Sequence, residues 1–169
     1  MECNIGLEIR VRKQIAQYLS LALADTYVLY VKTQNFHWNI IDPGFYSLHI
    51  FLEKQYEELA DGIDELAERI RMLGEKTPGT LKHFLEMTSI KEASEDLDAN
   101  EMLKDLLNGH ETISRFLRER IELVNKLLDQ ASGDLLIKQL AFHEKSAWML
   151  RASIQTQVAS ESRKNHGDR

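Results

Sequence analysis

Four long stretches of the chain repeat their apolar residues at the 3.6-residue spacing of an α-helix, and no proline interrupts the repeat. The stretches cover approximately residues 7–36, 43–73, 103–128 and 136–154. The two prolines, Pro43 and Pro78, lie outside the repeating apolar positions. Because an interior proline kinks or ends a helix, this placement permits four long helices. The sequence therefore predicts an all-α fold, a four-helix bundle whose apolar stripes face one core.

The segments between these stretches indicate how the helices are connected. Asp42 and Pro43 are typical of the first positions of a helix, and Gly74 is typical of the residue that ends one. Ser132-Gly133-Asp134 predicts a short break between the last two helices. Residues 75–98 form a much longer connection with a short apolar patch of its own. A connection of that length predicts a crossover along the bundle with a short extra helix between helices 2 and 3, as in ferritin-like topologies.

Composition and charge narrow the class of protein. Hydrophobic residues make up 43% and charged residues 28% of the chain, which predicts one globular domain over residues 1–169, with flexible tails at approximately 1–6 and 160–169. The single cysteine excludes an intrachain disulfide. No apolar run reaches the roughly 20 residues of a membrane span, and no signal-peptide pattern is present, so we expect a cytoplasmic protein. The formal net charge of −6 disfavours nonspecific binding to nucleic acid.

Five candidate metal ligands fall in the first half of the chain. They are His37, His49, Glu53, Asp64 and Glu68. Imidazole nitrogens and carboxylate oxygens are ligands that suit iron. His49 and Asp64 would lie roughly 22 Å apart along the same helix, because each residue adds 1.5 Å, so they cannot bind the same ion within one chain.

The spacing of these ligands has a symmetry that resolves the difficulty. The pair His49 and Glu68 and the pair Glu53 and Asp64 share one midpoint, between residues 58 and 59. An antiparallel copy of the helix, related by a two-fold axis through that point, would place each residue opposite the other member of its pair. The sequence therefore predicts metal sites shared between two identical chains. The alternative is a solvated face of carboxylates, with the histidines as ordinary polar residues of the core.

The other histidines do not predict a second metal centre. A di-iron site inside one four-helix bundle uses Glu-x-x-His on two helices, and no histidine here has a glutamate three residues before it. His110 and His143 lie on apolar faces, and we expect both to be core residues with hydrogen-bond partners rather than ligands. His83 and His166 lie in no pattern that indicates a metal site.

Several segments together resemble the Dps family, the mini-ferritins also known as DNA-protection-during-starvation proteins. These segments are Lys32–Asn39, Phe45–His49, Ile63–Ile70 and Trp148–Arg151. The resemblance implies a ferritin-like four-helix bundle, assembled as a hollow homo-dodecamer with a ferroxidase centre at each two-fold axis.

At that centre the resemblance assigns roles to single residues. It implies that His37 and His49 come from one subunit and Asp64 and Glu68 from its mate, with Glu53 at a fifth ligand position and two iron ions per site. Trp38 matches an electron donor beside the centre; the alternative is an aromatic residue of the core.

The activity implied by the resemblance is oxidation of Fe(II), preferably by hydrogen peroxide rather than oxygen, and storage of a ferric mineral. Two alternatives remain open: a DNA-compacting structural protein in which iron is incidental, and a cage that binds zinc or another divalent ion without turnover. Both tails are near charge balance, which speaks against DNA binding.

Two further acidic residues are candidates for an iron entry pore. Asp129 and Asp134 flank the junction of the last two helices, where the resemblance implies an acidic pore at a three-fold axis. A ring of carboxylates there would attract an entering cation. The alternatives are that Asp134 is the N-cap of the last helix and that Asp129 is an exposed residue of the preceding turn.

Overall fold

A computed structural model describes residues 3–161 of the chain, and the side chains as far as residue 154. These residues form five helices and no strand: α1 (Ile9–Asn39), α2 (Phe45–Met72), α3 (Leu81–Met87), α4 (Ala99–Lys126) and α5 (Gln130–Glu161). The expected all-α, ferritin-like bundle of four long helices is confirmed, and so is the short extra helix in the long connection. Residues 1, 2 and 162–169 of the expected tails lie outside the described residues.

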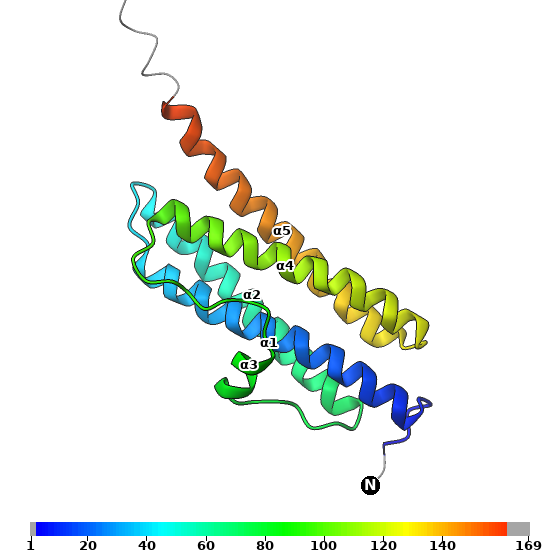
Figure 1. The fold of residues 1–169 in the computed structure, drawn as a ribbon. Helices are drawn as coiled ribbons and strands as arrows, with labels where there is room; N and C mark the ends of the chain where they lie inside the picture. Colours follow the sequence, from blue (N-terminus) through cyan, green and yellow to red (C-terminus); the bar gives the residue numbers. More distant parts are fainter. Residues whose placement is uncertain (1–2, 162–169) are drawn as a thin grey trace, which may run out of the picture.

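The bundle consists of two antiparallel helix pairs. Figure 1 shows α1 and α2 as one pair, α4 and α5 as the other, and α3 on the outer side of α1. The connection between α2 and α4 runs along the bundle, because α4 begins near the end at which α1 passes into α2 (Figure 1). None of the described helices is long and apolar enough to cross a membrane.

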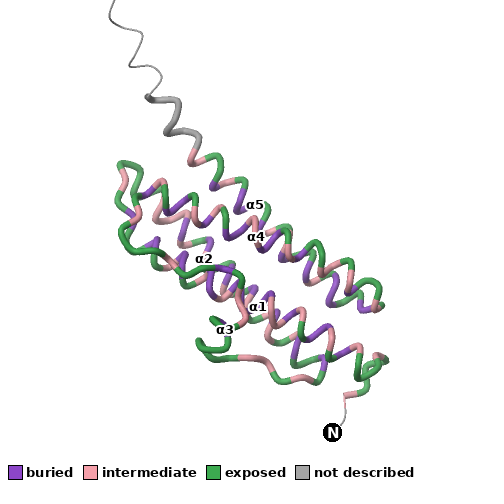
Figure 2. Tube along the Cα trace, in the orientation of Figure 1, coloured by how far each residue is buried: buried purple, intermediate pink, exposed green. Residues whose placement is uncertain are grey.

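One hydrophobic core lies between the four long helices, and α1 contributes most to it. Purple, buried positions follow the inward face of each helix in Figure 2. Ile15, Leu19 and Leu29 of α1 are fully buried, as are Leu59 of α2 and Leu106 of α4. Burying a leucine or isoleucine side chain contributes about 1.5–3 kcal/mol, so this shared apolar face holds the two helix pairs together.

Two helix ends differ from the sequence prediction. α2 begins at Phe45, with Gly44 as its N-cap, and the Asp42 carboxylate accepts a hydrogen bond from the Gly44 amide instead of capping the helix. α5 begins at Gln130, so the expected break at residues 132–134 is wrong. The chain turns earlier, at Leu128, whose φ of 60° lies in the left-handed region. The expected end of the second helix is confirmed, because Gly74 follows it with a φ of 89°.

The long connection is fixed to α1 by a buried carboxylate and an aromatic contact. Asp25 is 2% exposed and accepts hydrogen bonds from the Thr88 hydroxyl and from the amide and hydroxyl of Ser89. The Phe84 ring of α3 stacks on Tyr27 at 4.4 Å between ring centroids. These contacts satisfy the buried polar group and hold α3 against the bundle.

Candidate metal centre

His37 and His49 lie side by side, where the turn between α1 and α2 brings the end of one helix next to the start of the other. Their rings stack with 3.8 Å between centroids and 17° between planes. The Nδ1 atom of His37 lies 2.9 Å from the backbone oxygen of His49, and the Nδ1 atom of His49 lies 3.0 Å from the backbone oxygen of His37. The structure thus brings these two predicted ligands together in a reciprocal pair of hydrogen bonds.

These hydrogen bonds determine which nitrogen of each ring can bind a metal. A backbone carbonyl oxygen only accepts, so the Nδ1 atom of each histidine must carry the proton and donate it. In the neutral imidazole the Nε2 atom then has a free lone pair. A histidine that ligates a metal through one nitrogen normally donates its other ring N–H to a carbonyl or a carboxylate. Both histidines therefore present Nε2 in the form that a divalent ion binds.

Aromatic rings hold the histidine pair in place. Phe45 stacks on His49 at 5.0 Å between centroids, and the edge of Tyr56 meets His37 at 5.2 Å. Tyr30 packs against Tyr56 at 6.2 Å. Burial and the nearby carboxylates of Glu53 and Glu57 raise the pKa of Tyr56, so its phenol stays protonated. The role of Tyr56 beside the pair was missed in the sequence, although its position one turn after Glu53 on the same helix was a signal for it.

The three carboxylates of the predicted set have no partner within the described chain. Asp64 and Glu68 are exposed on α2, Glu53 is half-buried, and none of the three forms a hydrogen bond or ion pair with another described residue. Their neighbours differ: Glu65 is paired with Lys138, and Arg69 is paired with Asp129. These three unpaired carboxylates lie on the helix that carries His49, and they are available to bind a cation.

No single protomer completes the site within the part of the chain that the structure describes. No three described histidine, cysteine, aspartate or glutamate side chains come close enough together to bind one ion. His49 lies in the first turns of α2, whereas Asp64 and Glu68 lie toward its other end. The separation expected from the helix rise therefore holds in the fold, and the location of the centre between two chains stays a prediction.

Trp38 lies beside the histidine pair and is 67% exposed. The alternative interpretation of Trp38 as a core aromatic is therefore wrong for the protomer. Ile41, Phe45 and Tyr46 are also exposed, by 90%, 45% and 77%. These four residues lie close together in the sequence, and exposed clusters of large apolar side chains are typical of a protein–protein contact.

The two candidate pore residues differ in their surroundings. Asp129 is 4% exposed, and its carboxylate accepts hydrogen bonds from Arg69, at 2.8 and 3.0 Å, and from the amide and hydroxyl of Ser132. Burial raises the pKa of the Asp129 carboxyl, but the hydrogen bonds from Ser132 and the Arg69 guanidinium outweigh it and hold the pKa below its ordinary value.

Both alternative interpretations of these aspartates are therefore wrong. Asp129 is not an exposed residue of the preceding turn but a buried residue just before α5, and its carboxylate accepts a hydrogen bond from the Ser132 amide in the first turn of the helix. Asp134 is not an N-cap, because it lies inside α5, where it is exposed. Only Asp134 has a carboxylate that is free to line a pore, and that role stays a prediction.

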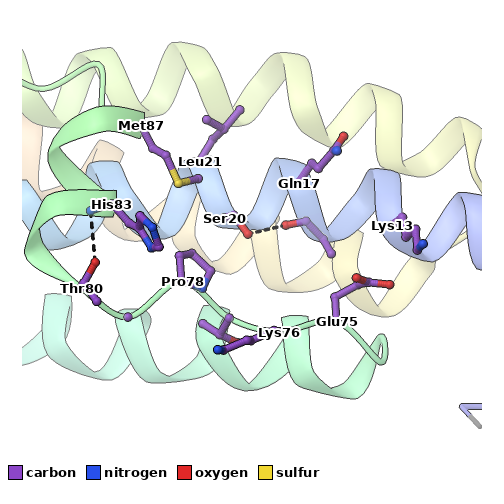
Figure 3. A pocket seen from close by; sticks show the side chains of 13 residues that line it. Lys13, Gln17, Ser20, Leu21, Glu75, Lys76, Pro78, Thr80, His83 and Met87 are labelled. Carbon is purple, nitrogen blue, oxygen red and sulfur yellow. Dashed lines mark hydrogen bonds between the residues drawn. The ribbon is translucent and has the colours of Figure 1, made fainter.

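An open pocket of about 960 Å³ lies away from the histidine pair, between α1, residues 75–80 and α3 (Figure 3). Lys13, Lys76, Glu75 and His83 line it together with apolar side chains such as Met87. Figure 3 shows the hydrogen bond from the His83 amide to the Thr80 hydroxyl, which caps α3. The pocket contains none of the predicted metal ligands, and its charges are of both signs, so it is not the candidate centre.

Comparisons with known proteins agree with this fold. Residues 16–157 match the model of the ferritin-like domain. DNA protection during starvation protein 2 of Bacillus anthracis is 38% identical over 142 residues, which are 84% of this chain and 97% of that protein.

Two solved structures have the same fold over nearly the whole chain. DpsC from Streptomyces coelicolor superposes with a TM-score of 0.88 at 28% identity, covering 91% of each chain. A Dps protein from Vibrio cholerae O1, described as a member of a broad superfamily of ferritin-like diiron-carboxylate proteins, superposes with a TM-score of 0.85 at 31% identity, covering 91% of this chain and 98% of that one. The chain belongs to the ferritin-like family and, within it, to the Dps proteins.

Proposed function

We propose that the protein is a ferroxidase and an iron store that oxidises Fe(II) at a centre formed by two copies of the chain. The observation that carries this proposal is the reciprocal pair of hydrogen bonds between His37 and His49. It leaves two Nε2 lone pairs side by side, at a position that already lies on the same α1–α2 hairpin as three unpaired carboxylates. The diiron-carboxylate description of the Vibrio cholerae relative supports iron as the ion.

Each complete site would combine His37 and His49 of one chain with Asp64 and Glu68 of a second copy. The common midpoint of the ligand pairs supports a two-fold axis beside residues 58 and 59 of α2. Exposure of Asp64 and Glu68 supports the same arrangement, because a second chain can reach them. The exposed apolar side chains beside His37 would be covered in the same contact. Glu53 would supply a further ligand, and the assembly would be a hollow dodecamer.

The chemistry follows from two iron ions reacting together. Two Fe(II) ions supply the two electrons that convert one hydrogen peroxide and two protons into two waters, which leaves two Fe(III) ions and releases no hydroxyl radical. Carboxylate oxygens favour the harder Fe(III) product, while the histidines keep the affinity for Fe(II) moderate. The net charge of −6 per chain would attract Fe(II) to the assembly. Exposed Trp38 would supply an electron when only one iron ion is bound.

The decisive experiment asks whether the centre is shared between chains. One variant carries His37→Ala and His49→Ala, and the other carries Asp64→Asn and Glu68→Gln. Each is expected to lose rapid Fe(II) oxidation in stopped-flow assays with peroxide. When the two variants are unfolded and refolded together, random pairing regenerates about a quarter of the sites, because half of the two-fold pairs are mixed and each mixed pair has one intact site.

The controls for this experiment show whether any recovered activity comes from a shared centre. A Glu119→Gln variant changes an exposed carboxylate of α4 and should oxidise iron at the parental rate. Refolding each site variant alone should restore nothing. If the co-refolded mixture also stays inactive while light scattering shows normal assembly, the shared centre is wrong. Tight zinc binding without iron turnover in the parent protein would instead indicate a cage without ferroxidase activity.

A further inference from the structure

A second pair of histidines lies in the interior of the bundle, between α4 and α5. His110 and His143 are both 0% exposed, and their Nδ1 atoms lie 2.9 Å apart. The rings are tilted by 52° with 5.1 Å between centroids, and the ring of Phe142 contacts both at 5.8 and 5.1 Å. The expectation that both would be core residues is confirmed, but their hydrogen-bond partner is each other.

This hydrogen bond requires one Nδ1 atom to donate a proton and the other Nδ1 atom to accept it. The accepting ring must therefore be neutral, and a second proton on the donating ring would have to sit on its buried Nε2 atom. A protonated imidazole carries hydrogen on both nitrogens. Protonation of the accepting ring would therefore place two N–H groups against each other and replace an attractive contact with a repulsive one. Both Nε2 atoms are buried and have no hydrogen-bond partner among the described residues.

Among the described residues, no charged group on the surrounding helices is placed to balance a proton on the pair. On α1, Asp25 is bound to Thr88 and Ser89, and Lys32 is bound to Asp105 of α4. On α4 and α5, the nearest acidic residues along the chain are Glu111, paired with Arg151, and Glu144, paired with Arg118.

The buried polar residue of α2 is also neutral. The contact between Gly62 and Gln139 sets α2 against α5, and Gln55 is the polar side chain of α2 that is buried in the bundle. Both polar atoms of the buried Gln55 amide lack a partner among the described residues. An amide can orient a dipole toward the pair, but it cannot neutralise a charge.

The packing beside the pair is tight where α4 meets α1. A Cβ atom added to Gly109, the residue before His110, would lie 2.7 Å from Leu29 of α1. The glycine therefore allows α4 to approach α1 closely at this level. A proton on either histidine would have to be accommodated in a dry and closely packed layer.

We propose that the His110–His143 pair is an acid-sensitive latch, which joins α4 to α5 while both rings are neutral and releases them when the interior is protonated. Burial lowers the pKa of His110 to about 3. Burial and the neighbouring His110 lower the pKa of His143 well below its ordinary value. Because the folded-state pKa values are depressed below those of the unfolded chain, the unfolded chain binds protons first as the pH falls.

The direction of the effect follows from proton linkage. Above the unfolded pKa, about 6.5, neither state is protonated at these residues, and the contribution of the pair is fully present. As the pH falls below 6.5, the equilibrium constant for unfolding rises about tenfold per pH unit for each histidine, and thus up to about 100-fold per unit for the pair. The protein would therefore lose stability in mildly acidic surroundings, independently of whether it oxidises iron.

The test compares the full-length protein with a variant that has no ionisable group in this layer. His110→Phe with His143→Leu fills the space with apolar side chains. Urea unfolding of both proteins is measured at pH 7.5, 6.5, 5.5 and 4.5 without iron. We expect the parent to lose stability more steeply below pH 6.5, so that the ratio of the two unfolding constants grows with each step. His83→Gln, which removes an exposed histidine, should follow the parent.

Equal pH dependence in the parent and the double variant would overturn the proposal. His37 and His49 are present in both proteins, so their titration cancels in this comparison. If the double variant does not fold, hydrogen exchange of the parent provides the second test. After correction for the intrinsic pH dependence of exchange, amides around His110 and His143 should lose protection at pH 5 before those in the α1–α2 pair. Retained protection of α4 and α5 would equally overturn the latch.

Discussion

The α1–α2 hairpin and the α4–α5 hairpin each hold two histidines in contact, but the contacts differ in what the Nδ1 atoms bind. In the first hairpin, each Nδ1 donates to a backbone oxygen, at 2.9 and 3.0 Å, and the Nε2 atoms remain free near an exposed surface. In the second, the two Nδ1 atoms bind each other at 2.9 Å in the interior. A carbonyl partner leaves a ring ready to bind a metal, whereas an imidazole partner makes the ring a hydrogen-bonding element of the core.

The carboxylates sharpen the contrast between the hairpins. Three unpaired carboxylates accompany His37 and His49, whereas those nearest His110 and His143 along the chain are already bound to arginines. A metal centre needs carboxylates that are free to bind the ion. The neutral His110–His143 pair, in contrast, requires that no free carboxylate lies close enough to stabilise a proton on it. The same residue type therefore serves opposite purposes according to the charge that surrounds it.

The largest effect is expected from removal of the free carboxylates. Asp64→Asn with Glu68→Gln should slow Fe(II) oxidation by roughly 100-fold or more, since loss of an outer-shell partner alone costs 10–100-fold. Stopped-flow absorbance with peroxide measures the rate, and light scattering checks that assembly is retained. If this variant oxidised Fe(II) at the parental rate, Asp64 and Glu68 would have no role in the reaction, and the proposed difference between the two hairpins would be wrong.

A somewhat smaller effect is expected from truncation of one ring in the first pair. His37→Ala should weaken Co(II) or Zn(II) binding by about 10–100-fold, because one nitrogen ligand is lost while the backbone oxygen that orients His49 remains. Isothermal titration calorimetry measures the affinity. His110→Phe with His143→Leu should leave the affinity unchanged, and a comparable loss in that variant would show that the two pairs do not have separate roles.

Asp129 provides a test of acid sensitivity in a different pH range. Asp129→Asn should destabilise the fold by about 2 kcal/mol, because Arg69 and Ser132 lose a charged acceptor. The folded-state pKa of Asp129 is depressed, so its contribution is present above the ordinary carboxyl pKa, about 4, and is lost as the pH falls below it. Urea unfolding from pH 7 to pH 3 should therefore separate this loss from one that begins at pH 6.5. If the Asp129 contribution and the histidine contribution were lost over the same pH range, the two groups would not act separately and this prediction would be wrong.

The smallest effect is expected at Asp134. If this exposed carboxylate lines an entry pore, Asp134→Asn should slow iron uptake by no more than about tenfold at low ionic strength, and by less at high ionic strength, where the field is screened. Uptake is followed by mineral absorbance at two salt concentrations. An equal rate at low salt would exclude Asp134 from the entry path without affecting either histidine pair.

Much of the fold was predictable from the sequence because amphipathic helices produce a regular spacing of apolar residues. The 3.6-residue repeat indicated the four long helices, and the length of residues 75–98 indicated the crossover with α3. The adjacency of His37 and His49 followed from the short turn between two helices. Helix starts were less predictable, because Asp42, Asp129 and Asp134 are all acceptable caps by residue type. Only their three-dimensional surroundings distinguish a capped turn, a buried ion pair and an exposed side chain.

The hydrogen bonds of the histidines could not be predicted from the sequence. Periodicity places His110 and His143 on apolar faces, but it does not report the rotation of α4 against α5 that brings the two Nδ1 atoms together. Similarly, the spacing of His37 and His49 does not show that each ring binds the backbone of the other. Both outcomes depend on side-chain rotamers, which tertiary packing selects.

The crossover between α2 and α4 divides the chain into an early and a late half, and this division has a consequence for biosynthesis. The histidine pair and the three candidate carboxylates all precede Gly74. During translation, this hairpin leaves the ribosome before α4 and α5 have been made, and local hairpins of helices form quickly. The face that would bind iron can thus take shape first. Substitutions in the α4–α5 hairpin can change the stability of the protein without altering any of the candidate metal ligands.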